Sequence, residues 1–442
     1  MTTRYRVTFE IYDESMEGRI ISSTKILDEA LVKPTNCFDY GMGQKNQIAL
    51  IQSVQDNILS AKTRMFINTE GECPECKTNL IKYGKSKSRY YDVYTDHKVQ
   101  IQRLRCDRCG YEAPRSIKGI FETDTSADLK KAQATLGAEH SYRDSEKIFE
   151  LFSTASREIN NHDRIKHTTE SVGKASHLLS KDESAIMFNE DAEELILNVD
   201  GGHVKTTEDK RSIEAITSVI YKPESIQPNK RGTRSILTSK HCAASVQDDN
   251  QQEIITNTII AALKQGIGEN THVTALSDGA DNCWNVINAI KPFCGSMTSI
   301  LDWFHIAMKV ENISLPKDLK ERLTRVKWHL WRGNTEYATI RLEQLVKLAK
   351  KDKDIDKIKK FLRYVINNKE RIVDYRARQK AGLVFTSNLA ESTVESLINQ
   401  RCKGQQHMRW SREGLNPVLQ LRAAIHSNDW QHKWKDIVLN AA

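Results

Sequence analysis

Glycine and proline are scarce in this sequence of 442 residues, which has 20 glycines and 8 prolines. So low a content excludes collagen-like and low-complexity chains and disfavours a fold of many short strands and turns. Long apolar runs are also missing and the mean hydropathy is -0.57, which excludes a membrane protein. The first residues, MTTRYRVTFEIYDES, carry charges where an export signal has an apolar core. These absences predict a soluble cytoplasmic protein with reduced cysteines.

The net charge of +8 is unevenly spread along the chain. Residues 77–118 hold eleven Lys and Arg against four Asp and Glu, a net charge of +7. Residues 401–435 hold seven against two, a net charge of +5, with three tryptophans among them. The remaining residues are slightly acidic as a whole. Localised positive charge suits phosphate binding, because each contact releases counterions, although a solvated basic surface without a partner is the alternative.

One Cys-x-x-Cys pair directly precedes the first basic segment, and a second pair lies within it. Their thiols are Cys73, Cys76, Cys106 and Cys109, and 30 positions separate Cys76 from Cys106. Residues 89–95 and 97–105 between the pairs alternate as β-strands do. Two such pairs around strands predict a zinc ribbon, with a redox-active pair as the weaker alternative. The Zn²⁺ is expected to be structural, because four thiolates leave no open coordination position.

Residues 127–179 have helical periodicity with a break at 153–159. Ser141 and Asp144 predict a capped start for the first helix of this pair. The second helix, 160–179, carries Arg164 and Lys166 near its start. Two helices around a short turn, the second basic at its beginning, are typical of a helix-turn-helix that reads DNA. An ordinary helical hairpin is the alternative.

Carboxylates follow apolar strands in the central part of the chain. Asp200 ends one such strand and Asp278 another, and a glycine follows each. The expected order is three strands, helix, strand, helix, strand, helix, which predicts a mixed α/β sheet with acids at strand ends. Residues 313–380 are strongly helical and interrupt this pattern as an all-helical insertion. Residues 386–388 are expected to cap the next helix, with Glu391 in its first turn.

Three carboxylates from distant parts of one sheet suit a two-metal site. Two Mg²⁺ ions need bridging oxygen ligands, and such a pair activates a nucleophile and stabilises the leaving oxygen at phosphorus. For any single one of Asp200, Asp278 and Glu391, a structural role at a strand end or helix cap is the alternative.

Several motifs resemble the DDE transposases of bacterial insertion sequences, most closely the ISKra-type group. They are Ser387-Asn388-Leu389-Ala390-Glu391-Ser392, Arg401-Cys402-Lys403-Gly404, Met408 to Gly414, Leu419 to Ala423, the Asp-Gly pairs at 200 and 278, Ile300 to His305, Trp328 to Gly333, Ser141 to Asp144 and Ile159 to Gly173. The resemblance implies an α/β multidomain chain with an RNase H-like catalytic domain, interrupted by the insertion and preceded by a zinc ribbon and a helix-turn-helix. It also implies metal-dependent DNA cutting and joining by a homodimer or larger multimer.

The resemblance assigns catalysis and Mg²⁺ binding to Asp200, Asp278 and Glu391, with Mn²⁺ as a substitute ion. Thr386-Ser387-Asn388 departs from the Gly-Ser-Gly of many family members. Glu395, four residues after Glu391, is the main rival for the third position, and Asp281 and Asp302 are lesser rivals to Asp278. His203 and His305 are near the acids in sequence, although a structural histidine is the commoner outcome.

The predicted organisation has six segments. They are 1–65 of unknown role, 66–122 as zinc ribbon, 123–185 as helix-turn-helix, 190–312 as the first part of the catalytic core, 313–382 as insertion, and 383–442 as final helix and basic C-terminal segment. The residues expected to contact DNA are Lys85, Lys87, Arg89, Arg103, Arg105, Arg164, Lys166, Arg401, Lys403, Arg409 and Trp410. For the C-terminal tryptophans, packing on the core is a nearly equal alternative.

The expected function is a DNA transposase that binds the double-stranded terminal repeats of a mobile element and joins them to target DNA. It would reside in the bacterial cytoplasm, on the nucleoid when bound to DNA, without contact to a membrane. A DNA-binding regulator without chemistry, descended from such an enzyme, and a nuclease that cuts without joining are the alternatives.

Overall fold

The computed structural model describes residues 3–16, 18–37, 40–69, 71–154, 157–181, 190–403, 408–427 and 429–440. The chain divides into two compact units, Met1–Ser171 with Val438–Ala442, and Val172–Ile437. Gly404 of the Arg-Cys-Lys-Gly motif and part of the break expected at 153–159 lie outside the described residues. None of the helices in these ranges combines the length and apolar character needed to cross a membrane.

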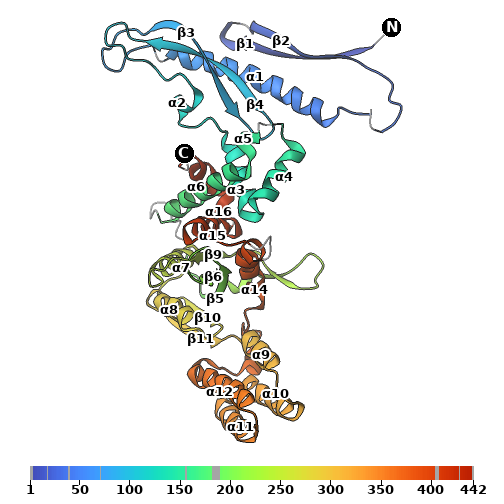
Figure 1. The fold of residues 1–442 in the computed structure, drawn as a ribbon, viewed down its shortest axis with the longest axis vertical. Coiled ribbons are helices and arrows are strands. Elements are labelled where there is room, and N and C mark those ends of the chain that lie inside the picture. The colour runs from blue at the N-terminus through green and yellow to red at the C-terminus, as the bar shows by residue number, and fades with distance from the viewer. Residues whose placement is uncertain are drawn as a thin grey trace. The chain divides into compact units, whose positions relative to one another are not determined.

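The first unit contains two antiparallel strand pairs and a group of helices (Figure 1). Its elements are β1 (Arg4–Asp13), the 3₁₀ turn η1 (Glu14–Met16), β2 (Arg19–Ala30), α1 (Gln44–Thr69), β3 (Ile81–Tyr91), β4 (Asp96–Arg105), α2 (Ile117–Phe121), α3 (Ala127–Glu139), α4 (Tyr142–Phe152), α5 (Arg157–Asn160) and the start of α6 (His162–Ser180). One face of the β3–β4 pair is apolar and packs against α1 and α2 through Val99, Ile101 and Ile117.

The helices after residue 126 pack on a small core of their own. Leu129, Phe149, Ile159 and Ile165 form its buried centre. The predicted cap of α4 is confirmed, since the backbone N–H of Asp144 donates to Ser141 Oγ at 3.1 Å and the Ser141 hydroxyl donates to Asp144 Oδ2 at 2.6 Å. The expected break between two long helices contains a further short helix, α5.

His97 joins α1 to the β3–β4 pair. Its ring is almost fully buried, with Nδ1 2.8 Å from Asp56 Oδ1 and Nε2 2.9 Å from Asp92 Oδ2. Burial alone lowers the pKa of His97, but the two carboxylates outweigh this effect and raise it above the usual 6.5. The imidazolium therefore contributes stability that is complete below pH 6.5 and is lost as the pH rises through the raised pKa of the folded protein.

We expect the hydrogen-exchange protection of α1, corrected for intrinsic rates, to fall about tenfold or more as the pH rises through that pKa, because charged hydrogen bonds contribute roughly 1.5–3 kcal/mol. His97→Gln should show low protection across the whole pH range. The exposed His167 provides a control, and His167→Gln should behave as wild type. Protection of α1 that is independent of pH in the wild type would contradict this role.

The second unit is built on a mixed five-stranded sheet. Its elements are the rest of α6, β5 (Glu194–Lys205), β6 (Ser212–Tyr221), η3 (Pro223–Ser225), β7 (Ile226–Pro228), β8 (Ser235–Leu237), β9 (His241–Ser245), α7 (Gln252–Lys264), β10 (His272–Ser277), α8 (Asp281–Ile290), η4 (Lys291–Phe293), β11 (Ser296–Leu301), α9 (Trp303–Asn312), α10 (Lys317–Trp331), α11 (Thr335–Leu348), α12 (Asp352–Asn367), η5 (Lys369–Arg371), α13 (Tyr375–Lys380), α14 (Asn388–Val394), the π-helix η6 (Glu395–Lys403), α15 (Arg412–His426) and most of α16 (Asp429–Leu439). The predicted mixed α/β sheet and the helices between β11 and α14 are confirmed.

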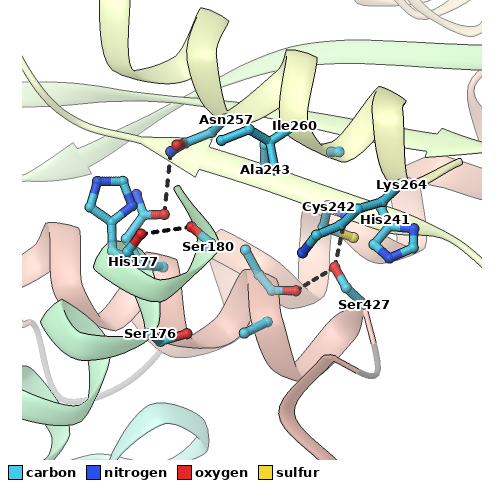
Figure 2. A pocket seen from close by; sticks show the side chains of 14 residues that line it. Ser176, His177, Ser180, His241, Cys242, Ala243, Asn257, Ile260, Lys264 and Ser427 are labelled. Carbon is cyan, nitrogen blue, oxygen red and sulfur yellow. Dashed lines mark hydrogen bonds between the residues drawn. The ribbon is translucent and has the colours of Figure 1, made fainter. Parts of the chain in front are cut away.

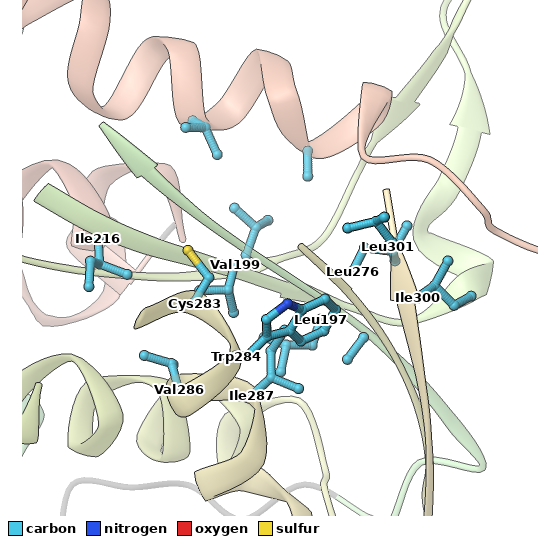
Figure 3. Packing of buried hydrophobic residues seen from close by; sticks show 14 of the residues in the cluster. Leu197, Val199, Ile216, Leu276, Cys283, Trp284, Val286, Ile287, Ile300 and Leu301 are labelled. Carbon is cyan, nitrogen blue, oxygen red and sulfur yellow. The ribbon is translucent and has the colours of Figure 1, made fainter. Parts of the chain in front are cut away.

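The strand order of this sheet is β11-β10-β5-β6-β9. Strands β5, β6 and β9 are antiparallel neighbours, whereas β10 and β11 run parallel to β5. The third of the three strands expected before the first helix is instead split into β8 and β9. Figure 3 shows how Leu197 and Val199 of β5 lie against Cys283, Trp284 and Ile287 of α8 in the buried core.

Candidate functional site

Sheet register places Asp200 level with Asp278, although β5 continues to Lys205 and so does not end at Asp200 as expected. Ser277, the last residue of β10, pairs with Val199 of β5, so each aspartate directly follows a residue of that pair. The backbone turns sharply after Asp278, where Gly279 has a φ of +96° and the Ala280 N–H donates to Asp278 Oδ1 at 2.9 Å. A Cβ at Gly279 would lie 2.8 Å from Tyr364 Cε2. Glycine at this position therefore allows both the turn and the close approach of α12.

Glu391 approaches Asp200 from the start of α14. Ligand atoms of Asp200, His305 and Glu391 all lie within 4.8 Å of one another. Burial, followed by the negative charge of Asp278, raises the pKa of Asp200, although His305 partly opposes this. Burial and the charge of Asp200 likewise raise the pKa of Glu391. The acids are thus crowded and partly desolvated, and a cation among them would relieve their repulsion.

Asp278 is outside that group of three but influences Asp200 electrostatically. Its main chain is fixed by α12, because the Tyr364 hydroxyl donates to the Asp278 carbonyl oxygen at 2.9 Å. The two sequence rivals differ in their surroundings. Asp281 is exposed and is the first residue of α8, whereas Asp302 is buried.

Asp302 orients His305 and ties the two ends of the insertion together. Its Oδ2 lies 2.7 Å from His305 Nδ1 and accepts from the Ser387 hydroxyl at 2.7 Å. Its Oδ1 accepts from the backbone N–H of Ser387 at 2.9 Å and of Phe304 at 3.2 Å. Burial alone raises the pKa of Asp302, but these hydrogen bonds outweigh it and lower the pKa. These contacts occupy both carboxylate oxygens of Asp302 and hold the His305 ring through Nδ1, so Nε2 is the nitrogen left for a ligand.

The capping role expected for residues 386–388 is corrected by these contacts. Ser387 stands before α14, but its side chain makes no capping bond and donates to Asp302 instead. The charged acceptor fixes the orientation of the Ser387 hydroxyl, whose oxygen accepts no N–H from the first turn of α14. His305 is the residue that sequence reasoning undervalued. The signal that identifies it is an Asp at a helix N-cap with a His three positions later, because such residues face each other across the first turn.

Glu391 of α14 and Glu395 of η6 differ in burial and in their neighbours. Glu391 is half-buried and within reach of Asp200 and His305. Glu395 is exposed and accepts a hydrogen bond from Asn399 Nδ2. His203, the other histidine considered, is also exposed and lines a separate hollow with Lys205 and Arg409. The geometry therefore favours Glu391 as the third carboxylate.

The four thiols of the Cys-x-x-Cys pairs converge in the first unit, with their sulfur atoms within 4.8 Å of one another. The two turns share one hydrogen-bond pattern. The N–H of Cys73 donates to the Thr78 carbonyl at 2.8 Å, and that of Cys106 donates to the Tyr111 carbonyl at 2.8 Å. A hydrogen bond from the Thr78 hydroxyl, helped by backbone N–H groups, lowers the pKa of Cys106 to about 6. This possible four-cysteine site presents the donor set that Zn²⁺ prefers.

One face of the β3–β4 pair is basic and exposed. Lys85, Lys87 and Arg89 alternate along β3, and Arg89 pairs with Lys98 of β4. Arg105 is exposed as well, whereas Arg103 is half-buried and places its guanidinium 4.2 Å from the centre of the Tyr83 ring. Among the other predicted DNA contacts of this unit, Arg164 and Lys166 are exposed near the start of α6.

Two predicted DNA contacts near the C terminus are buried. Arg401 is 0% exposed and stacks on the ring of Trp410, which is 7% exposed. The backbone of Trp410 pairs with the end of β5 through Lys205 and Thr207. Packing on the core, the alternative considered for the tryptophans, therefore describes Trp410, and neither side chain is available to DNA in this structure.

Lys403 and Arg409 of the same segment are exposed. The ammonium group of Lys403 lies 3.1 Å from the point that a Cβ on Gly202 would occupy, two residues after Asp200 on the same side of β5. A positive charge thus lies on the face of β5 that carries Asp200.

A separate small cavity lies between α6, β9, α7 and α15 (Figure 2). Its volume is about 50 Å³ and its lining includes His177, Cys242 and Asn257. This space is large enough for one or two water molecules and too small for a nucleotide. The cavity contains none of the three carboxylates, so we assign no ligand to it.

The chain belongs to the uncharacterised protein family UPF0236, which matches residues 125–436. A comparison with curated proteins gives no match. The family description states no activity, so the likeness to DDE transposases of the ISKra-type group stays a prediction.

Proposed function

We propose that this protein is a DNA transposase of the DDE type, which cuts and joins DNA strands by in-line attack at phosphorus. The arrangement of the second unit carries the proposal. Asp200 in the central strand, Asp278 after its parallel neighbour and Glu391 on a helix beyond the insertion come together just beyond the end of β10. Their placement in an order of three antiparallel and two parallel strands supports an RNase H-like catalytic domain.

The donor set fits divalent metal ions that prefer oxygen ligands. Asp200, Asp278 and Glu391 would hold two Mg²⁺ ions, for which Mn²⁺ is a suitable substitute, and His305 Nε2 is a further candidate ligand. When bound, such ions activate the attacking oxygen and stabilise charge at the phosphorus centre. Crowding and burial, which raise the pKa of Asp200 and Glu391, favour cation binding at this place.

The chain's own residues supply orientation and charge around that centre. Asp302 fixes the ring of His305 through Nδ1, so Nε2 is positioned to take a proton or to hold a phosphate oxygen. Tyr364 anchors the backbone at Asp278. Lys403, close to Gly202, provides a positive charge for the DNA backbone.

The first unit would bind the terminal repeats of the element. The convergence of four thiols supports a structural Zn²⁺ in a zinc ribbon, and the exposed face with Lys85, Lys87 and Arg89 supports contact with phosphates. We further propose that α4 and α6 act as a helix-turn-helix on double-stranded DNA. A homodimer or larger multimer in the bacterial cytoplasm would hold two ends at once.

One assay tests the activity. The purified protein is incubated with labelled fragments from both flanks of its own gene, a supercoiled target plasmid, and Mg²⁺ or Mn²⁺. We expect metal-dependent cutting at the element ends, followed by joined products. Binding without cutting would replace the proposal with a DNA-binding regulator, and cutting without joined product would replace it with a nuclease.

A further inference from the structure

The helical insertion carries more positive charge than either basic segment recognised above. Residues 313–382 hold twenty Lys and Arg against nine Asp and Glu, a net charge of +11. Acidic residues elsewhere offset this excess, so the chain outside the two basic segments is slightly acidic as a whole. The insertion lies far from the thiols in sequence and needs its own explanation.

A hollow of about 160 Å³ lies between α10 and α11 within the insertion. Its lining is Arg322, Arg325, Val326, His329, Arg341, Gln344, Leu345 and Leu348. The positions on each helix repeat at spacings of three, four and seven residues, so each set occupies one helical face. Val326 and Leu345 are buried and form the floor, whereas the arginines are exposed at the rim.

The three arginines have no anionic partner among the described residues. Neither Arg322, Arg325 nor Arg341 forms an ion pair there, and the lining of the hollow contains no Asp or Glu. Arg341 Nη1 donates only to Gln344 Oε1, at 3.1 Å. By contrast, Lys327 on a neighbouring face of α10 is paired with Glu311 at 2.8 Å. Three guanidinium groups around one hollow repel each other unless an anion lies between them.

The framework of the hollow is well fixed before any ligand binds. Leu323, Leu330 and Leu342 are fully buried between the helices. The turn that joins α10 to α11 contains Gly333 with a φ of +68°, where a Cβ would lie 2.9 Å from the backbone nitrogen of Asp374. A ligand would therefore meet helices already in place, which lowers the ordering cost of binding.

We propose that Arg322, Arg325 and Arg341 form a binding site for the phosphodiester backbone of double-stranded DNA. Guanidinium groups match phosphate oxygens in geometry and charge. A volume of about 160 Å³ is small for a whole small-molecule ligand but suits a phosphate that projects from a polymer. This inference rests on the proposed function and gives the insertion a direct part in holding DNA.

The test compares two double variants of the full-length protein that lose equal charge. Arg325→Gln with Arg341→Gln removes two of the rim charges, whereas Lys353→Gln with Lys359→Gln removes two exposed charges on α12. Binding to a fluorescent 40-bp duplex is followed by anisotropy at several salt concentrations. We expect the arginine variant to bind about tenfold more weakly, with its log–log salt slope smaller by about 1.8, since each phosphate contact contributes about 0.9. The lysine variant should stay near wild type.

Equal behaviour of the two double variants would overturn the inference, as would a wild-type protein that does not bind the duplex. Thermal stabilisation by inorganic pyrophosphate is measured in parallel. If pyrophosphate stabilises wild type but not the arginine variant, while both bind duplex equally, the hollow takes small phosphate anions and the DNA assignment is wrong. Cutting is assayed separately, so a protein that shows the arginine-dependent duplex binding but never cuts would contradict the proposed function and retain this inference.

Discussion

Replacing Asp200 by Asn is expected to reduce metal-dependent DNA cutting by at least about 10³-fold, because losing one member of a catalytic group that acts as a unit removes most of its rate enhancement. The change keeps the size of the side chain but removes one negative charge from the group formed with His305 and Glu391. DNA binding should persist, since the exposed basic residues of the first unit are untouched. Single-turnover cutting of a labelled fragment from the gene flank, alongside anisotropy on the same fragment, measures both quantities.

Two neighbouring acids provide matched controls for this prediction. Asp281→Asn alters an exposed residue at the start of α8, and Glu395→Gln alters an exposed residue four positions after Glu391. Both should cut at close to the wild-type rate, whereas Asp278→Asn and Glu391→Gln should fail as Asp200→Asn does. Wild-type cutting by Glu391→Gln together with loss in Glu395→Gln would transfer the third position to Glu395.

Replacing Cys73 and Cys106 by Ser is expected to abolish tight Zn²⁺ binding and to unfold the region around the β3–β4 pair. These two buried thiols come from separate turns, so the variant loses one ligand from each Cys-x-x-Cys pair. Zinc bound by four thiolates contributes on the order of 10 kcal/mol to such small units. Elemental analysis should find about one zinc per wild-type chain and none in the variant, and hydrogen exchange over residues 71–115 should lose its protection.

The exposed Cys37 gives the matching control, because Cys37→Ser alters a thiol outside both turns. It should keep the zinc and the protection of wild type. A wild-type protein purified without zinc, with residues 71–115 still protected after chelation, would show that the four cysteines do not form a metal site.

Local sequence periodicity predicted several of the helices and strands correctly. Helix α8 is the helix expected after the strand that precedes Asp278, and its apolar face repeats at helical spacing directly after the Asp-Gly pair. The alternating residues of β4 likewise marked a strand with one buried face. The third expected strand was predicted less well, since residues of high strand propensity do not show whether one strand continues or a turn divides it into two.

The site was only partly accessible to such reasoning. Asp200 and Asp278 stand out because each follows an apolar run and precedes a glycine, but the proximity of His305 depends on how α9 follows β11. Arg401 was misjudged because a positive charge does not reveal whether its guanidinium points to solvent or stacks on Trp410 inside the fold. The arginines of α10 and α11 were not predicted to form one site. They come together only because the two helices pack against each other in the folded chain.

The hydrogen bonds between Ser387 and Asp302 have a consequence for how the insertion relates to the rest of the chain. They close its base, with help from the Tyr375 hydroxyl, which donates to the Leu301 carbonyl at 2.7 Å. These bonds fix the position of Glu391 at the base of the insertion. The length of the insertion has little effect on that position, because enlarging a closed loop adds little entropic cost. The helices beyond this base could therefore change in length without moving Glu391, except for α12, which Tyr364 ties to Asp278.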